Sequence, residues 1–322
     1  MSRKHFCFRG FHKERNMLLF RQMCVLFAIM LVGLYAYKRK FLDDASCKKL
    51  SSIVVNIANP AMVLSSITGE ERIPKSLFFR SFLLVVAIYV VMLLLAELVP
   101  RLLRVNIDER GVYKTMLVFS NIGFMGFPVI SVVYGTDALL YASLFLIPYN
   151  VLIYTYGIKS MITTREKSSV KEKIKSIFNV GTIFCCIAIT LYLFDIYVPE
   201  VPSKIIETLS SLTAPLSMMV IGASFASMNM KKLFTDVRLL LFSALKLILI
   251  PMFLLFVFHF LPLDPKMFGV ILVMLTTPVG SMTAMLAQEY DGNYSLASRG
   301  VAITTILSIV TMPLVSAFTE FF

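Results

Sequence analysis

The residues with the clearest potential for chemistry are Ser120 to Pro128, which read SNIGFMGFP. They lie in the uncharged run Thr115–Thr136, where two glycines and a proline interrupt an apolar segment that would otherwise form a helix. In a bilayer, interrupted backbone is stable only where its N–H and C=O groups are buried in protein or line a cavity. A polar amide, Asn121, stands at the interruption. The stretch therefore predicts a site lined by backbone amides and a side-chain amide.

A second uncharged run, Met267–Gln288, repeats this design around the residues TTPVG at 276–280. A shift of 156 positions places Ser120 on Thr276 and Asn121 on Thr277. Interrupted apolar segments at corresponding places in two halves of a chain are the best sequence indication of a transporter's binding site. The alternative is a pair of packing glycines with proline kinks, which membrane helices commonly contain. The matched pair favours the binding site.

The chemistry that these breaks offer is anion binding. Each half-helix after a break begins with backbone N–H groups and the positive end of the helix dipole, which stabilise an anion by about 0.3–1 kcal/mol, or ~2 kcal/mol when partly buried. Neither break contains an arginine, so a carboxylate would depend on amides and hydroxyls. For Asn59 a helix–helix hydrogen bond, and for Asn179 a helix N-cap, are equally good interpretations. The predicted substrate-binding residues are Asn121, Gly123, Met125, Thr277, Val279, Gly280, Ser281, Asn59 and Asn179.

Lys246 is the only cationic residue deep in an apolar run, ~15 Å from its start at 1.5 Å per residue. At that depth its ammonium requires a partner or a water-filled cavity, so it is a candidate charge partner. The sequence places no carboxylate near the middle of an apolar run, so it indicates no proton relay of paired acids, and the five cysteines show no metal-ligand spacing. We therefore expect no metal and no cofactor. The residues predicted to form the crossover or its hinges are Pro60, Gly126, Pro128, Pro215 and Pro278.

Composition indicates the class of protein. The chain is 58% hydrophobic and 16% charged, whereas soluble domains contain roughly 25% charged residues. The net charge of +12 could indicate a nucleic-acid partner, but the basic residues lie in short segments between apolar runs, as in polytopic membrane proteins. We expect the lipid bilayer as a partner and no nucleic acid.

Ten apolar runs have lengths near the ~20 residues that cross a ~30 Å hydrocarbon core. Five runs in each half give the halves opposite orientations. The sequence therefore predicts an all-α membrane protein of ten transmembrane helices, built as two inverted five-helix repeats with crossed, broken helices 4 and 9. The runs are Gln22–Tyr37, Leu50–Gly69, Ser81–Ala96, Thr115–Thr136, Ala138–Ile158, Ser176–Phe194, Thr208–Met230, Leu239–Leu263, Met267–Gln288 and Gly300–Phe318. The predicted divisions are a basic N-terminal tail at 1–21, a first repeat at 22–161, a cytoplasmic connector at 162–175 and a second repeat at 176–320.

Basic residues predict the orientation in the cell membrane. Of the 31 lysines and arginines, 19 lie in the connectors after the odd-numbered runs, which should therefore be cytoplasmic. Both termini are then outside. The basic N-terminal tail opposes this orientation, and translation from Met17 would remove most of the conflict.

The pattern N-x-x-x-M-G-x-P from Asn121 to Pro128, followed by Tyr134-Gly135, resembles the fourth-helix crossover of the auxin efflux carrier family. The residues AQEY at 287–290 resemble its ninth-helix crossover, and 214–222 its seventh helix. The resemblance extends from about Phe20 to the C-terminus. It implies a ten-helix inverted-repeat fold akin to bile-acid/sodium symporters, with a scaffold domain, a transport domain, elevator-type movement and organic-anion substrates. Bacterial members are regarded as permeases for malate, malonate and other carboxylates.

Three features depart from the family pattern. The third run has no acidic residue, the sixth opens Asn179-Val180 where Asn-Pro is frequent, and a short connector replaces a long cytoplasmic loop. The resemblance therefore carries over Asn121, Pro128 and Pro278, but not auxin as the substrate.

The sequence thus predicts a secondary, elevator-type transporter of organic anions, such as malate, malonate or auxin-like acids. A homodimer through the scaffold helices is a further expectation. The alternatives are an anion channel or a membrane-embedded sensor of similar ligands. An enzyme is disfavoured because Ser281 has no evident histidine partner within the membrane.

Overall fold

A computed structural model of the chain describes residues 2–68, 74–161, 180–227, 234–290 and 292–319, and the regular structure within these ranges is helical. Five of the described helices are long and apolar enough to cross a membrane, and a bent pair, Ala138–Leu152 with Thr155–Met161, makes a sixth candidate. Shorter apolar helices include those on the C-terminal side of the first break and the N-terminal side of the second. The chain is thus a helical protein with several candidate spans, and ten crossings remain a prediction. The five long helices are Met17–Lys38, Lys75–Leu102, Glu200–Ser224, Val237–His259 and Tyr294–Phe318.

Each of the ten predicted apolar runs overlaps at least one described helix, although several boundaries differ. The first helix runs through the predicted tail, which contains no proline, and the predicted run from Thr208 begins at Glu200. The predicted connector, 162–175, lies wholly outside the described residues. In chain order, the elements are α1 (Ser2–Lys38), α2 (Asp44–Ile53), η1 (Val54–Ala58), α3 (Asn59–Ser65), α4 (Lys75–Leu102), α5 (Ile107–Val118), η2 (Ile122–Gly126), α6 (Phe127–Tyr134), α7 (Ala138–Leu144), α8 (Leu146–Leu152), η3 (Ile153–Gly157), α9 (Ile158–Met161), α11 (Val180–Leu193), α12 (Glu200–Ser210), α13 (Thr213–Ser224), η4 (Phe225–Ser227), α15 (Val237–Ala244), η5 (Leu245–Leu249), α16 (Ile250–His259), α17 (Pro265–Thr276), α18 (Ser281–Glu289) and α19 (Tyr294–Phe318).

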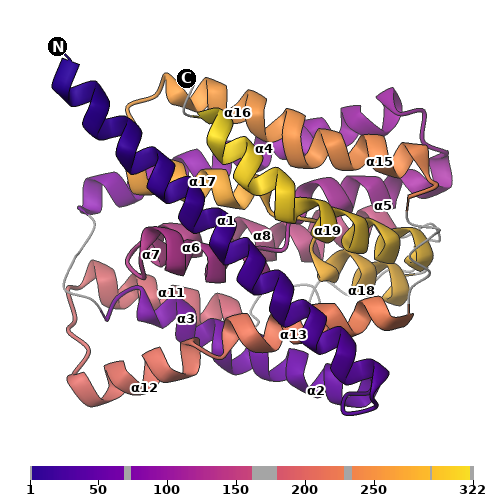
Figure 1. Cartoon of the computed structure of the whole chain (residues 1–322), viewed down its shortest axis with the longest axis horizontal. Helices are drawn as coiled ribbons and strands as arrows, with labels where there is room; N and C mark the ends of the chain where they lie inside the picture. Colours follow the sequence, from indigo (N-terminus) through magenta and orange to yellow (C-terminus); the bar gives the residue numbers. More distant parts are fainter. Residues whose placement is uncertain (1, 69–73, 162–179, 228–233, 291, 320–322) are drawn as a thin grey trace.

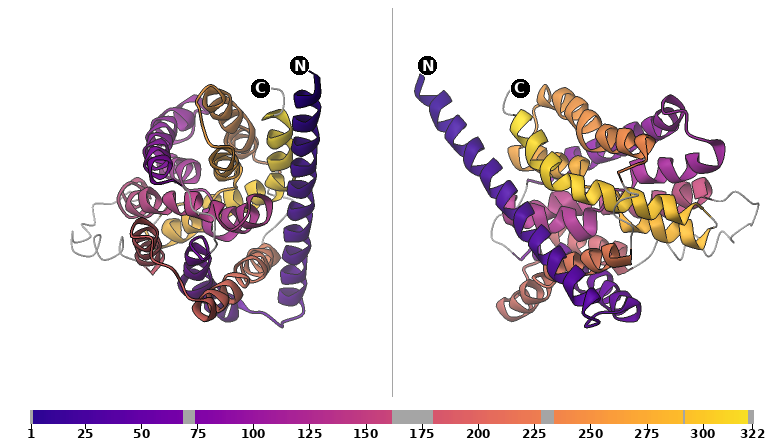
Figure 2. Two further views of the ribbon diagram at one scale, coloured as in Figure 1. Left: turned by 90° about the vertical axis from the view of Figure 1, so that its left-hand side faces the viewer. Right: turned by 45° about the vertical axis from the view of Figure 1, so that its right-hand side comes forward.

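The helices form two groups (Figure 1). One group contains α2, α3, α11, α12 and α13, which pack on one another. The other contains α4 to α9 and α15 to α19, with both broken helices in it. Helix α1 runs diagonally along the outside of both groups, and it begins at the end of the molecule where α19 finishes (Figures 1 and 2).

Helices α1 and α13 approach each other through two glycines. A Cβ at Gly33 would lie 2.1 Å from the carbonyl oxygen of Met219, and one at Gly222 would lie 1.8 Å from that of Met30. Residues without a side chain let membrane helices pack backbone against backbone. This reciprocal contact joins α1 firmly to the group that contains α13.

At three prolines the helix continues, because each proline comes just after a wide, π-helical turn. The π-helical turns η1, η2 and η5 come directly before the segments that contain Pro60, Pro128 and Pro251. Proline has no N–H to donate, and its ring clashes with the carbonyl four residues earlier in an α-helix. A π turn changes the spacing of the bonded groups at that point, so the helix continues through the proline.

Candidate functional site at the crossing of two broken helices

The two breaks meet near the middle of the second group. Helix α5 ends before the first break and α17 before the second, and the interrupted segments pair as antiparallel backbone, with Ser120 opposite Val279. The Asn121 N–H donates to the carbonyl oxygen of Pro278 at 2.8 Å, and the Gly280 N–H donates to the carbonyl oxygen of Phe119 at 2.8 Å. The interruptions recognised in the sequence are therefore one structural unit, the crossing.

The first break is shorter than its sequence indicated. The prediction extended it from Ser120 to Pro128, whereas the backbone is non-helical only around 119–121, and Gly126 and Pro128 lie within η2 and α6. The π turn before the proline accounts for the difference, since it lets the helix accommodate a residue without an N–H. Of the predicted hinge prolines, Pro278 lies in non-helical backbone, while Pro60 and Pro215 lie in the first turns of α3 and α13.

Gly280 allows the two backbones to come together. A Cβ there would lie 3.0 Å from the carbonyl oxygen of Ser120 and 3.1 Å from that of Phe119. The Gly280 N–H donates to the same Phe119 oxygen, so a side chain would press on the atoms that make the pairing. The glycine is therefore explained by close approach.

Two buried amide atoms at the crossing lack a hydrogen-bond partner among the described residues, Asn121 Nδ2 and Asn59 Oδ1. Asn121 is 5% exposed. Asn59 lies against η2, because a Cβ placed on Gly123 would be 2.9 Å from its Nδ2. Buried polar groups are normally hydrogen-bonded, so an unpaired donor and an unpaired acceptor point to a ligand or water at this place. The two asparagines come from different helix groups.

Some of the predicted amides already have acceptors within the protein. The Val279 N–H donates to Thr304 Oγ1 at 3.1 Å, and the Met125 N–H donates to the carbonyl oxygen of Asn121 at 3.2 Å. The Thr277 hydroxyl donates to the carbonyl of Met274 in its own helix. These predicted residues therefore build the crossing in this conformation.

The first-turn amides of the two half-helices supply the remaining donors. Helix geometry provides no intrahelical acceptor for the first N–H groups of a helix. After the first break these include Gly123 and Phe124, and after the second they include Ser281 and Met282. Two helix N-termini at one place favour an anion. The predicted Asn179 lies outside the described residues.

Hydroxyl groups that the sequence analysis did not single out also hold the crossing. Ser217 of α13 donates to the carbonyl oxygen of Phe124 at 3.0 Å, which connects the two helix groups beside Asn59. Ser308 of α19 lies 3.9 Å from the sulfur of Met125. Such contacts join residues far apart in the chain, and no local pattern predicts them.

In α19, the spacing of the hydroxyl residues in the sequence does indicate which side of the helix faces the protein. Thr304, Ser308 and Thr311 are spaced i, i+4 and i+7, and all three are buried. That spacing places them on one face of a helix, so a stripe of hydroxyls within an apolar run marks the side that faces other helices. Of these three residues, Thr304 is the one whose hydroxyl oxygen accepts from the Val279 N–H in the second break.

Lys246 lies in η5 and is 1% exposed. Its Nζ donates to Ser120 Oγ at 2.6 Å, so it contacts the first break directly. Within the described ranges, its ammonium makes no ion pair with a carboxylate. The partner that its depth required is thus a hydroxyl group at the crossing.

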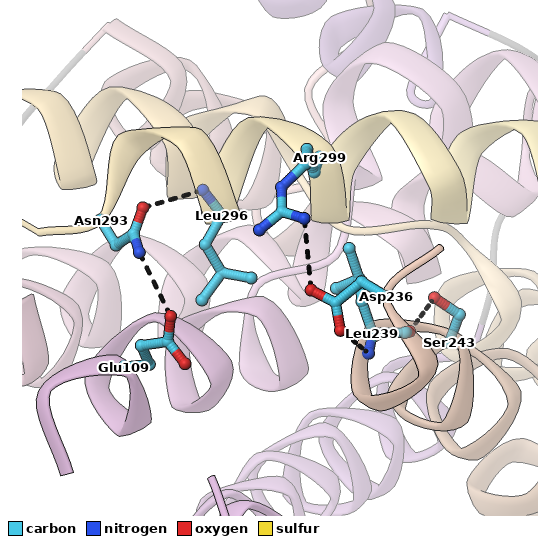
Figure 3. A network of polar contacts seen from close by, with 7 residues as sticks. All are labelled: Glu109, Asp236, Leu239, Ser243, Asn293, Leu296 and Arg299. Carbon is cyan, nitrogen blue, oxygen red and sulfur yellow. Dashed lines mark hydrogen bonds and ion pairs between the residues drawn. The ribbon is translucent and has the colours of Figure 1, made fainter. Parts of the chain in front are cut away.

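Polar contacts at both ends connect each broken helix to the other. The Lys266 ammonium at the start of α17 pairs with Asp137, which follows α6. At the opposite end, Asn293, which follows α18, donates to Glu109 at the start of α5 at 3.3 Å (Figure 3). The same Asn293 caps α19, where its Oδ1 accepts from the N–H of Leu296.

An ion pair beside this cap joins α19 to α15. Arg299 donates to Asp236 at 3.2 Å, and Asp236 also caps α15 by accepting from the Leu239 N–H (Figure 3). The group of helices that contains the crossing is therefore held together at its ends as well as its centre.

Comparisons with known proteins agree with this architecture. Residues 18–316 match the family described as membrane transport protein. An uncharacterized transporter of Methanocaldococcus jannaschii is 24% identical over 90% of this chain and 95% of its own length. A second uncharacterized transporter, from Methanothermobacter thermautotrophicus, is 21% identical over 89% of this chain and 93% of its own. With its crossing of two broken helices and a family match over almost its whole length, this chain belongs to the membrane transport protein family, the auxin efflux carrier family that its motifs resemble.

Proposed function

We propose that the protein is a secondary transporter that carries small organic anions, such as malate, malonate or auxin-like acids, across the cell membrane. The observation that carries this proposal is the pair of buried, unpartnered amide atoms, Asn121 Nδ2 and Asn59 Oδ1, beside two helix N-termini. Asn121 Nδ2 is a donor for a carboxylate oxygen, and Asn59 Oδ1 suits a hydroxyl of the same substrate.

An anion suits this place better than a cation or a neutral solute. The first-turn amides of η2 and α18 lie where the positive ends of two helix dipoles meet. The neutral side chains around them add donors without a fixed charge that would slow release. Carboxylates therefore fit a site that must bind and let go in every cycle.

The arrangement of the helices supports movement of one group against the other. The closest glycine contacts do not join the two groups. Gly222 of α13 meets α1, whereas Gly111, Gly269 and Gly300 each meet another helix of the second group. Between the groups, the crossing is contacted by the short polar side chains of Asn59 and Ser217. Polar side chains can exchange partners when surfaces slide, so an elevator movement is our proposal for the mechanism.

The proposed topology is ten spans in two inverted repeats, with both termini outside. The start of α1 and the end of α19 lie at one end of the molecule (Figure 2), as an even number of crossings requires. We also propose that the group containing α12 and α13 forms the fixed scaffold and provides the contact of a homodimer.

The test is an uptake screen in proteoliposomes with labelled malate, malonate, lactate and indole-3-acetate, with and without imposed proton or sodium gradients. We expect saturable uptake of at least one acid, which Asn121→Ala and Asn59→Ala reduce. The matched control is Asn56→Ala, because Asn56 is exposed and its amide bonds to Ser52 of its own helix. Unitary currents without saturable uptake would contradict a transporter and favour the channel.

A further inference from the structure

We propose that Lys246 is the built-in cation of the crossing, which neutralises the C-terminal ends of α5 and α17 in the place where an inorganic cation would otherwise bind. This inference rests on the proposed function only in treating the crossing as the working part of the transporter. Its evidence is the position of one ammonium group.

The ammonium lies at the crossing but outside the reach of solvent. Lys246 is 1% exposed and its Nζ lies 2.6 Å from Ser120 Oγ. The turn that carries it, η5, packs against α17 and α19, which belong to the same helix group as the crossing. The side chain therefore approaches the first break from within that group.

The substrate amides lie on the other face. Ser120 and Asn121 are consecutive residues of the non-helical segment, and the backbone turns at Asn121, where the Ile122 N–H donates to the carbonyl oxygen of Ser120 at 2.9 Å. Ser120 meets Lys246, whereas the stretch that follows Asn121 meets Asn59 and Ser217 of the other group. Lys246 is thus behind the proposed binding site and not within it.

The charges around Lys246 explain how a buried ammonium is tolerated. An unpaired charge in the bilayer interior is costly, and the described residues provide no carboxylate for this one. Helix α5 ends at Val118 and α17 at Thr276, both at the crossing. Each helix C-terminus carries roughly −0.5 elementary charge, so the two together balance one ammonium.

The ammonium also has unused donor capacity. It has three N–H donors, and the described side chains offer it one acceptor at hydrogen-bonding distance, Ser120 Oγ. Helix geometry leaves carbonyl groups without an intrahelical partner at the ends of α5 and α17, and we assign the remaining donors of the ammonium to this end of the two helices. A small cation coordinated by such carbonyls would occupy the same position, and Lys246 fills it covalently.

The test adds back, as a free small molecule, the part of the Lys246 side chain that a substitution to alanine removes. Lys246→Ala deletes Cγ, Cδ, Cε and Nζ, which together correspond to n-propylammonium. We expect Lys246→Ala, purified in detergent, to melt at a lower temperature than the unmodified protein. Millimolar n-propylammonium chloride should then raise its Tm by about 2–4 °C relative to choline chloride of the same ionic strength.

Propan-1-ol fills the same volume without charge and should raise the Tm less than n-propylammonium. The matched control is Lys204→Ala on the exposed face of α12, which neither compound should stabilise. Equal effects of amine and alcohol, or no effect of either, would overturn the proposal. So would Lys246→Met with the Tm of the unmodified protein, because a neutral chain of similar length would then suffice.

A second arm uses the unmodified protein. Because the cation is covalent, replacing choline chloride by sodium chloride at constant ionic strength should leave its Tm unchanged, and stabilisation specific to sodium would contradict the proposal. Neither arm requires a transported substrate, so their failure is separate from a failure of the uptake screen.

Discussion

The backbone N–H of Asn121 donates to the carbonyl oxygen of Pro278 at 2.8 Å, while the Nδ2 of the same Asn121 is buried without a partner in the described part of the chain. The residue thus has two separate roles. Its main chain joins the two broken helices, and its side chain presents a donor that the protein itself does not use. A substitution of Asn121 can therefore remove the side-chain donor while the backbone bond that joins the two broken helices remains.

Gly123→Ala is expected to reduce transport strongly with little effect on stability. The new Cβ would lie 2.9 Å from Asn59 Nδ2, so the amide must move, whereas alanine favours the helix by up to about 1 kcal/mol. Uptake and Tm should be measured together. Gly126→Ala in the same turn is the control, since its nearest neighbour would be Met274 Sδ at 3.4 Å. Equal uptake by the two variants would argue against a role for Asn59.

Thr304→Val should destabilise the crossing by about 1–3 kcal/mol, because the buried N–H of Val279 loses its acceptor. Chemical or thermal unfolding in detergent measures the effect, and Thr304→Ser should restore most of it. Thr305→Val is the matched control, since that buried hydroxyl donates to Val301 of its own helix. Similar losses in both variants would mean that the bond to Val279 is not important.

Gly222→Ala should separate α1 from α13 and impair folding. The added Cβ would lie 1.8 Å from the carbonyl oxygen of Met30, and backbone on both sides leaves no flexible atom to yield. The expected result is a low yield of folded protein, measured by size-exclusion chromatography. Ser224→Ala on the exposed side of α13 is the control. A normal yield of Gly222→Ala would show that the two helices can move apart.

Reporters fused after Lys167 and Lys232 should report the cytoplasm, and one at Phe322 the outside. The reason is the accumulation of basic residues in the connectors after the odd-numbered runs. Alkaline phosphatase and green fluorescent protein fusions give opposite signals on the two sides. A cytoplasmic C-terminus would remove the inverted repeat from the account.

The sequence predicted the two breaks well, because glycine and proline in an uncharged run interrupt a helix through their own backbone chemistry. It placed Asn121 at the first break, where the structure has it. It extended that break too far, to Pro128, because a π turn that accommodates proline leaves no clear trace in residue types. Local patterns therefore located the breaks but not their lengths.

The partners of these residues could not be predicted. Ser120 and Lys246 are 126 positions apart, and nothing near either residue indicates the other. The pairing of Ser217 with Phe124 likewise depends on how two helix groups pack. Such contacts follow from tertiary structure, whereas the hydroxyl stripe that includes Thr304 was visible as a helical period in the sequence.

Binding of an organic anion at the crossing is tested most directly by the affinity of Asn121→Ala for that anion. The ligand is the acid with the highest uptake among malate, malonate, lactate and indole-3-acetate, and binding is measured by calorimetry in detergent. We expect affinity to fall by about 0.5–3 kcal/mol, with Tm nearly unchanged because the backbone bond to Pro278 remains. Asn56→Ala should bind as the unmodified protein does. If folded Asn121→Ala binds and transports the acid as well as the unmodified protein, the crossing is structural and the substrate binds elsewhere.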